Sequence, residues 1–228
     1  MDYQVRLWAA RRDSQPAAQP AIPHWPVVTL SREFGTAGSQ IGERLAELLG
    51  FAFWDRRLLE TIAEKIHTSV IDLNSVDERV PGPLQEFLSI VLRVMEVPSR
   101  AFHDALSELV RALERRGSAV IVGRGAGHLV DPARALRVRV TAPLEHRVEH
   151  HAKQQRLDRA TAREQVLQVD KERQSYIEQR FRARADDPLH YDFVLNVAAL
   201  PIDRAAELLR EVYRAKFNEL PKPAAAAR

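Results

Sequence analysis

Short apolar, β-branched runs alternate with amphipathic helical stretches along most of this chain, and no other feature constrains its fold as strongly. Five runs have the composition of buried strands: residues 27–30, 51–53, 119–122, 136–140 and 192–196. The clearest helical pattern places apolar residues at helical spacing from Phe102 to Leu113 and ends at Gly117. Strands separated by helices predict right-handed crossovers. We therefore expect an α/β fold with a five-stranded parallel sheet and helices on both faces.

The other helices are predicted from apolar spacing and from the glycines and prolines that bound them. They lie at residues 41–49, 58–66 and 159–182, after Pro143 and after Pro201. In the last of them, the predicted inward-facing residues are Ala205, Leu208, Leu209 and Val212. The sequence contains no internal repeat, so one folded domain is expected.

The two ends of the chain and one internal stretch depart from this pattern. Residues 1–26 are mixed or rich in Pro, Ala and Gln without a period, which predicts a flexible arm, and residues 221–228 form a second frayed end. The arm lacks the apolar segment of a signal peptide, so export is not predicted. Residues 68–98 contain a Pro-Gly-Pro break between amphipathic flanks, which predicts a helical insertion within a single domain spanning 27–220.

The composition excludes several classes of function. Cysteine is absent, which excludes disulfides, thiolate catalysis and Cys-ligated metal centres, and fits a protein of the reducing cytoplasm. No apolar run reaches the length that would span a membrane. The 34 Lys and Arg residues nearly balance 31 Asp and Glu residues, giving a net charge of +3. We therefore expect no nucleic-acid partner, although a local basic site facing phosphate remains compatible with this charge.

Candidate site residues follow three of the predicted strands. In parallel sheets, ligands bind at the carboxyl ends of the strands, which here carry residues 31–35, 55–57 and 123–125. A strand, a glycine-containing loop and a helix N-terminus together form an anion site, because backbone N–H groups and the helix dipole converge there. The alternative for residues 31–38 is an ordinary strand-to-helix turn that uses its glycines for tightness.

Five motifs occur in a fixed order along the chain. They are the segments 31–42 (Ser-Arg-Glu-Phe-Gly-x-x-Gly-x-x-Ile-Gly), 55–57 (Asp-Arg-Arg), 123–124 (Gly-Arg), 170–173 (Asp-Lys-Glu-Arg) and 188–196. In this order they resemble the cytidylate kinase-like family over about residues 27–217. The resemblance implies a P-loop nucleoside monophosphate kinase fold with an Arg-bearing lid at 157–187. It also implies phosphoryl transfer from ATP to CMP, dCMP or a similar nucleoside monophosphate, with Mg²⁺.

The resemblance also assigns expected roles to individual residues. The phosphate loop and its metal position correspond to Gly35, Thr36, Ala37, Gly38, Ser39 and Gln40, with Ser39 at the metal. The acceptor site corresponds to Asp55, Arg56 and Arg124, and the lid arginines correspond to Arg173 and Arg180. Arg173 and Arg180 are seven residues apart and share a helix face, so both can point at phosphates. The alternative is a solvated helix in which these arginines pair with Glu172 or Glu178.

Two departures from the family pattern bear on catalysis. No lysine occurs between residues 27 and 64; Gly38 stands at the P-loop lysine position, and Ser39 stands where many members carry arginine. Arg32 is the cation that could replace this charge, and it is our third candidate catalytic residue. Gly125 replaces the Asp that follows the arginine in cytidylate kinases. Two functions therefore stay open: a phosphotransferase, and a weakly active or inactive nucleotide sensor.

A third function is suggested by His146-Arg147-Val148-Glu149-His150, which spells the H-x-x-E-H motif of one zinc peptidase class. Histidines four apart share a helix face and could hold zinc. The simpler interpretation is that this segment, with His151, is a solvated helix leading into the lid.

Finally, the apolar face of 102–113 and the 68–98 insertion could serve a homodimer.

Overall fold

The computed structural model of this chain describes residues 25–55 and 100–221. The predicted helix at 58–66, the insertion at 68–98, the acceptor-site candidate Arg56 and most of the two predicted end segments lie outside the described residues. Within the described part, no helix is long and apolar enough to cross a membrane.

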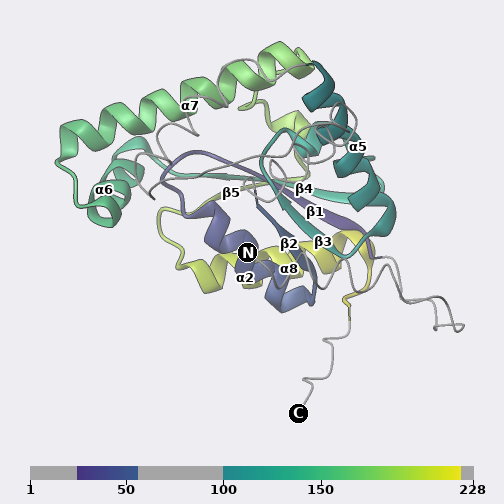
Figure 1. The fold of residues 1–228 in the computed structure, drawn as a ribbon. Coiled ribbons are helices and arrows are strands. Elements are labelled where there is room, and N and C mark those ends of the chain that lie inside the picture. The colour runs from purple at the N-terminus through teal and green to yellow at the C-terminus, as the bar shows by residue number, and fades with distance from the viewer. Residues whose placement is uncertain (1–24, 56–99, 222–228) are drawn as a thin grey trace, which may run out of the picture.

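Five parallel strands form a single sheet in the order β2-β3-β1-β4-β5 (Figure 1). The strands are β1 (Val27–Arg32), β2 (Ala52–Trp54), β3 (Ala119–Val122), β4 (Ala135–Thr141) and β5 (Phe193–Asn196). The pairing confirms the predicted parallel sheet, and the order puts the first strand, β1, at its centre. Because β1 lies between β3 and β4, the residues at the carboxyl ends of these three strands are neighbours across the sheet.

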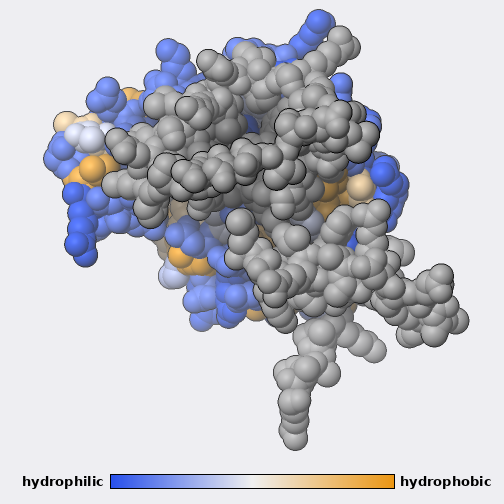
Figure 2. Space-filling view, viewed as in Figure 1, coloured by the Kyte–Doolittle hydropathy of each residue, from blue (hydrophilic) through white to orange (hydrophobic). Residues whose placement is uncertain are grey.

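Helices cover both faces of the sheet, giving three layers (Figure 1). The helices are α2 (Gly38–Leu49), α5 (Arg100–Arg116), α6 (Leu144–Gln155), α7 (Arg159–Phe181) and α8 (Ile202–Phe217). Helices α2 and α8 bury one apolar cluster against the sheet, and α5 buries a second against the opposite face. Helices α6 and α7 pack on each other through Val148, Ala162 and Val166. The described surface on the side shown in Figure 2 is mostly hydrophilic, with small apolar areas.

The burial of the central strand, β1, on both faces explains why the predicted strand runs are continuously apolar. Val28 and Leu30 point into the cluster under α2 and α8, whereas Val27 points into the cluster under α5. A strand covered on both faces has no solvent side, so its residues do not alternate between apolar and polar.

The last helix corrects one prediction. Leu208 was expected to face inward but is 40% exposed, whereas Tyr213 is fully buried. The helix begins at Ile202, so the inward stripe runs through Ala205, Leu209 and Tyr213 at intervals of four residues. The Tyr213 hydroxyl donates a hydrogen bond of 2.8 Å to the carbonyl oxygen of Pro26, just before β1.

Candidate functional site

A cavity of about 790 Å³ lies at the carboxyl ends of β1, β3 and β4, against helix α7. Its walls come from the ends of three strands and from α7. They are residues 31–33 at the end of β1, residues 123–125 after β3, Arg139 of β4, the α7 segment 168–180 and residues 184–186. This volume is within the range of pockets that hold small molecules and cofactors. The cavity therefore lies where an open parallel sheet is expected to bind its ligand.

Arginines dominate the polar lining of this cavity. They are Arg32, Arg124, Arg139, Arg173, Arg180 and Arg184. Four of them, all except Arg139 and Arg184, were singled out by the sequence. Segments more than a hundred residues apart therefore direct guanidinium groups into one space, as an anionic ligand would require.

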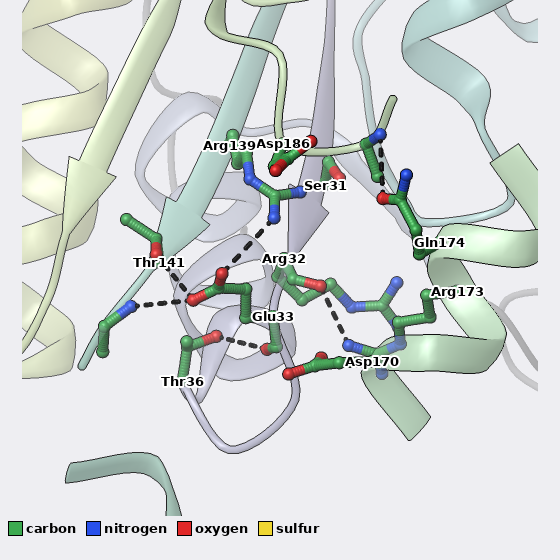
Figure 3. Close-up of polar contacts among 12 residues, drawn as sticks. Ser31, Arg32, Glu33, Thr36, Arg139, Thr141, Asp170, Arg173, Gln174 and Asp186 are labelled. Atoms are coloured by element: carbon green, nitrogen blue, oxygen red, sulfur yellow. Dashed lines mark hydrogen bonds and ion pairs between the residues drawn. The ribbon is translucent and has the colours of Figure 1, made fainter. Parts of the chain in front are cut away.

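Arg32 lies between Gly38 and Gly123, and its side chain leaves no room for a lysine at position 38. A Cβ placed on Gly38 would lie 2.8 Å from Cβ of Arg32, and one on Gly123 would lie 2.2 Å from its Nη1. A lysine at position 38 would therefore collide with the stem of Arg32. The guanidinium of Arg173 donates to the Arg32 carbonyl oxygen at 2.9 Å (Figure 3). It also lies over the Phe34 ring, 5.4 Å from its centroid.

The loop that follows β1 is engaged by two other helices. The Phe34 N–H donates a 2.8 Å hydrogen bond to the Asp170 carboxylate of α7, and Asp170 also pairs with Arg147 of α6. Arg147 donates to the Phe34 carbonyl oxygen at 3.1 Å. A Cβ on Gly35 would lie only 2.7 Å from the Arg147 carbonyl oxygen, so only glycine fits this approach. The first half of the predicted phosphate loop is thus held by α6 and α7.

The second half of that loop, residues 37–40, is better suited to bind an anion than the first half. Ala37 adopts a left-handed conformation with φ of 54°, and α2 then begins at Gly38 without a side-chain hydrogen bond at its N-cap. A turn of this kind directs successive backbone N–H groups of residues 38–40 outward from a helix N-terminus. Residues 35–40, including Ser39, do not line the described cavity, which lies beside this helix end.

Glu33, one of the candidate residues 31–35, joins β1 to β4, a role that was not predicted from the sequence. Its carboxylate accepts hydrogen bonds from the Thr141 hydroxyl at 2.6 Å and the Ala142 N–H at 3.2 Å. Arg139 and Arg147 approach it more loosely, each at 3.4 Å (Figure 3). Glu33 therefore fixes the start of the loop relative to the end of β4. Its partners are more than a hundred residues away, so no local pattern in the sequence signals this role.

The end of α7 is anchored through the glycine that departs from the family pattern. Gly125 has φ of 66°, and a Cβ on it would lie 2.3 Å from Cε2 of Phe181. The Phe181 ring also stacks on His128, with 4.8 Å between the ring centroids. Phe181 therefore occupies the space that a side chain at position 125 would need, and it fixes the helix end next to Arg180.

A buried histidine, His103, lies near Arg180. Burial, together with the positive charge of Arg180, lowers the pKa of His103 to about 4. Its ring is 5.6 Å from that of Tyr176, whose own ring lies 5.5 Å from the guanidinium carbon of Arg124. The protonation state of His103 is thus linked to the charge of the arginine cluster.

The zinc motif lies on α6, and its surroundings correct the interpretation as a solvated helix. Arg147 and His151 are both buried at 7% exposure, and His151 Nε2 is 2.7 Å from Gln165 Oε1 of α7. The carboxylate of Glu149 accepts a hydrogen bond from Lys153 at 2.7 Å. No three His, Asp or Glu side chains in the described part of the chain are placed to hold a metal ion.

The predicted acceptor residue Asp55 follows β2 and does not line the cavity.

Comparisons with known proteins agree with this geometry. The model of the cytidylate kinase-like family matches residues 27–199. The chain belongs to this family. Together with the sheet order, this membership gives the chain a P-loop kinase-like α/β/α fold. No curated protein matches the sequence significantly.

Solved structures show the same fold for this cytidylate kinase-like chain at low sequence identity. An uncharacterized protein from Eubacterium ventriosum is 18% identical, with a TM-score of 0.64 over 83% of this chain and 99% of its own. The protein TT1252 from Thermus thermophilus is 18% identical, with a TM-score of 0.51 over 85% and 98%.

Proposed function

We propose that this chain is a nucleotide phosphotransferase that transfers a phosphoryl group from ATP to CMP, dCMP or a similar nucleoside monophosphate. The observation that carries the proposal is the convergence of Arg32, Arg124, Arg173 and Arg180 on one cavity at the carboxyl ends of the strands. Phosphoryl transfer depends mainly on positioning and on neutralising negative charge, which converging arginines provide. Family membership supports the same class of reaction.

The residues of the chain divide the work between donor and acceptor. In this proposal the backbone N–H groups of residues 38–40 hold the donor phosphates, and Arg32 supplies the charge that a P-loop lysine supplies elsewhere. Arg124 holds the acceptor phosphate, while Arg173 and Arg180 neutralise charge between the two nucleotides. The Ser39 hydroxyl would face the Mg²⁺ that accompanies ATP. When bound, this ion would offset the negative charge of the phosphates.

A second candidate function is a nucleotide sensor without turnover. It is favoured by the contact between Asp170 and the Phe34 N–H, which already holds part of the loop, and by the absence of a lysine between residues 27 and 64. A cytoplasmic location and a homodimer stay predictions of the sequence.

One experiment separates the two candidates. ADP formation is measured with ATP and Mg²⁺ against CMP, dCMP, UMP, AMP and GMP, alongside the melting temperature with each nucleotide. A phosphotransferase gives turnover with at least one monophosphate and loses it in Arg173→Ala. A sensor shows a nucleotide-dependent rise in melting temperature, because ligand binding stabilises the folded state, but gives no turnover. A chain that shows neither response contradicts both.

A further inference from the structure

Arg139 is a charged residue at the floor of the cavity, in a strand whose other face is apolar. It is only 9% exposed, and in the parallel register it lies beside Ser31 of β1. Leu136, Val138 and Val140 point into the cluster under α2 and α8. Arg139 alternates with them and therefore projects from the opposite face of the strand, where it lines the cavity.

Arg137, two residues earlier on the same face, shows how a structural arginine is satisfied in this strand. Its Nη2 and Nε donate to the Asp192 carboxylate at 3.0 and 3.3 Å, and its backbone N–H donates to the same group at 2.8 Å. Arg137 does not line the cavity. Arg137 is thus paired through two side-chain nitrogens with one carboxylate of the fold.

The pairing of Arg139 is much weaker. Its polar contact within the described residues is a 3.4 Å approach to Glu33, whose carboxylate takes shorter hydrogen bonds from Thr141 and Ala142. Its guanidinium carbon lies 5.8 Å from the Tyr191 ring centroid, and the charge of Asp186 is nearby (Figure 3). A guanidinium has five N–H donors, and burying it with so loose a partner costs free energy. An anion in the cavity would recover that cost.

The order of the strands gives this anion a place. Arg124 follows β3, Arg32 ends β1 and Arg139 lies near the end of β4, and all three line the cavity. Arg173 and Arg180 line the same cavity from α7. An anionic group above the end of β1 is therefore flanked by arginines from both neighbouring strands.

We propose that Arg139 is a ligand-contacting residue that binds the phosphate of the acceptor monophosphate, opposite Arg124. This inference rests on the proposed function and adds a residue that the resemblance does not assign. The ligand class is a phosphate monoester, whose oxygens match the planar fork of a guanidinium. The weak approach to Glu33 holds the side chain in position until the ligand binds.

The test compares Arg139→Met with Arg137→Met, a matched change two residues away on the same strand. CMP is titrated into the parent and each variant by calorimetry, and melting temperatures are measured with and without inorganic phosphate. We expect Arg139→Met to weaken CMP binding roughly ten- to a hundredfold and to lose the phosphate-induced stabilisation. Arg137→Met should bind CMP as the parent does. Arg139→Lys, which keeps the charge but not the fork, should fall between parent and Arg139→Met.

Ligand-free stability gives a second readout that a purely structural arginine would move differently. Arg139→Met should melt at or above the temperature of the parent, since it removes a weakly paired buried charge, whereas Arg137→Met should melt lower because Asp192 loses a partner. Parent-like CMP affinity in Arg139→Met and Arg139→Lys overturns the inference and leaves the proposed function standing. Arg139-dependent phosphate binding without any nucleotide binding overturns the proposed function and the acceptor role, and leaves Arg139 as a contact for free phosphate. A parent that binds neither CMP nor phosphate overturns both.

Discussion

The Asp170 carboxylate of α7 accepts a 2.8 Å hydrogen bond from the backbone N–H of Phe34, 136 residues earlier in the chain. Backbone N–H groups of such loops are the donors that hold phosphate in anion-binding sites. Here one of them is bonded to a negatively charged side chain of the same protein, and that side chain is in turn paired with the buried Arg147. Helix α7 and the loop after β1 are thus joined by a contact that resembles a bound anion.

We therefore predict that Asp170→Asn tightens ATP binding several-fold, because a neutral amide competes less well with phosphate for the loop. The same change should lower the free energy of unfolding by about 1–3 kcal/mol, since Arg147 loses its charged partner. Glu164→Gln, on the exposed side of the same helix, is the control and should change neither quantity. Weaker ATP binding in Asp170→Asn would instead show that Asp170 holds the loop in its binding conformation.

The second prediction concerns the ATP side of the site. Arg32→Ala should weaken ATP binding roughly ten- to a hundredfold, on the order of 1.5–3 kcal/mol for a lost charge-assisted hydrogen bond. Arg57→Ala, at a position outside the described residues, should have a smaller effect. Ser39→Arg should tighten ATP binding, at a small loss of stability in the free protein, because a cation is disfavoured at a helix N-terminus. ATP titrations at one salt concentration check all three; parent-like affinity in both Arg32→Ala and Ser39→Arg would refute the assignment of this loop.

The third prediction separates backbone strain from crowding at Gly125. Gly125 and Gly50 have φ of 66° and 65°, but only Gly125 lies against Phe181. Each change to alanine should cost about 1 kcal/mol for the left-handed backbone. Gly125→Ala should cost a further ~1–3 kcal/mol, because the Phe181 ring must move. Denaturant unfolding of the two variants measures the difference, and equal losses would mean that Phe181 moves freely.

The fourth prediction is a loss of stability in mild acid. Because burial lowers the pKa of His103 to about 4, the unfolded chain binds a proton at His103 more readily than the folded chain. The stabilisation from neutral His103 is complete above its ordinary pKa of about 6.5 and is lost as the pH falls from there toward 4. Burial also lowers the pKa of His128, which adds an effect of the same sign.

Chemical denaturation between pH 4 and 7.5 tests this expectation. His103→Gln removes the titrating group and should flatten the profile over the acid half of the range. An unchanged slope in that variant would assign the acid sensitivity to His128 or to other groups.

The fold was predictable because its signals are local. The strand at residues 119–122 was predicted with the bounds it has, and the helix ending at Gly50 was marked by a glycine that adopts the expected left-handed conformation. The arginines of the site were predictable only where a motif singled them out. Glu33 and Asp170 lie within the motifs, but their contacts were not predicted, and Arg139 was not singled out; Glu33 pairs with Arg139, and Asp170 with Phe34, across more than a hundred residues. The burial of His151 depends on how α6 packs on α7, which no spacing within α6 reveals.

The hydrogen bond from Tyr213 to Pro26 has a consequence for how this protein is made. It joins residues 187 positions apart, and α8 supplies one wall of the apolar cluster that the central strand needs. During synthesis, the first strand leaves the ribosome long before the helix that completes its packing. The nascent chain must therefore keep an apolar strand from aggregating until its last few dozen residues have emerged. A chain cut after residue 199, where the family match ends, would remain in that unfinished state.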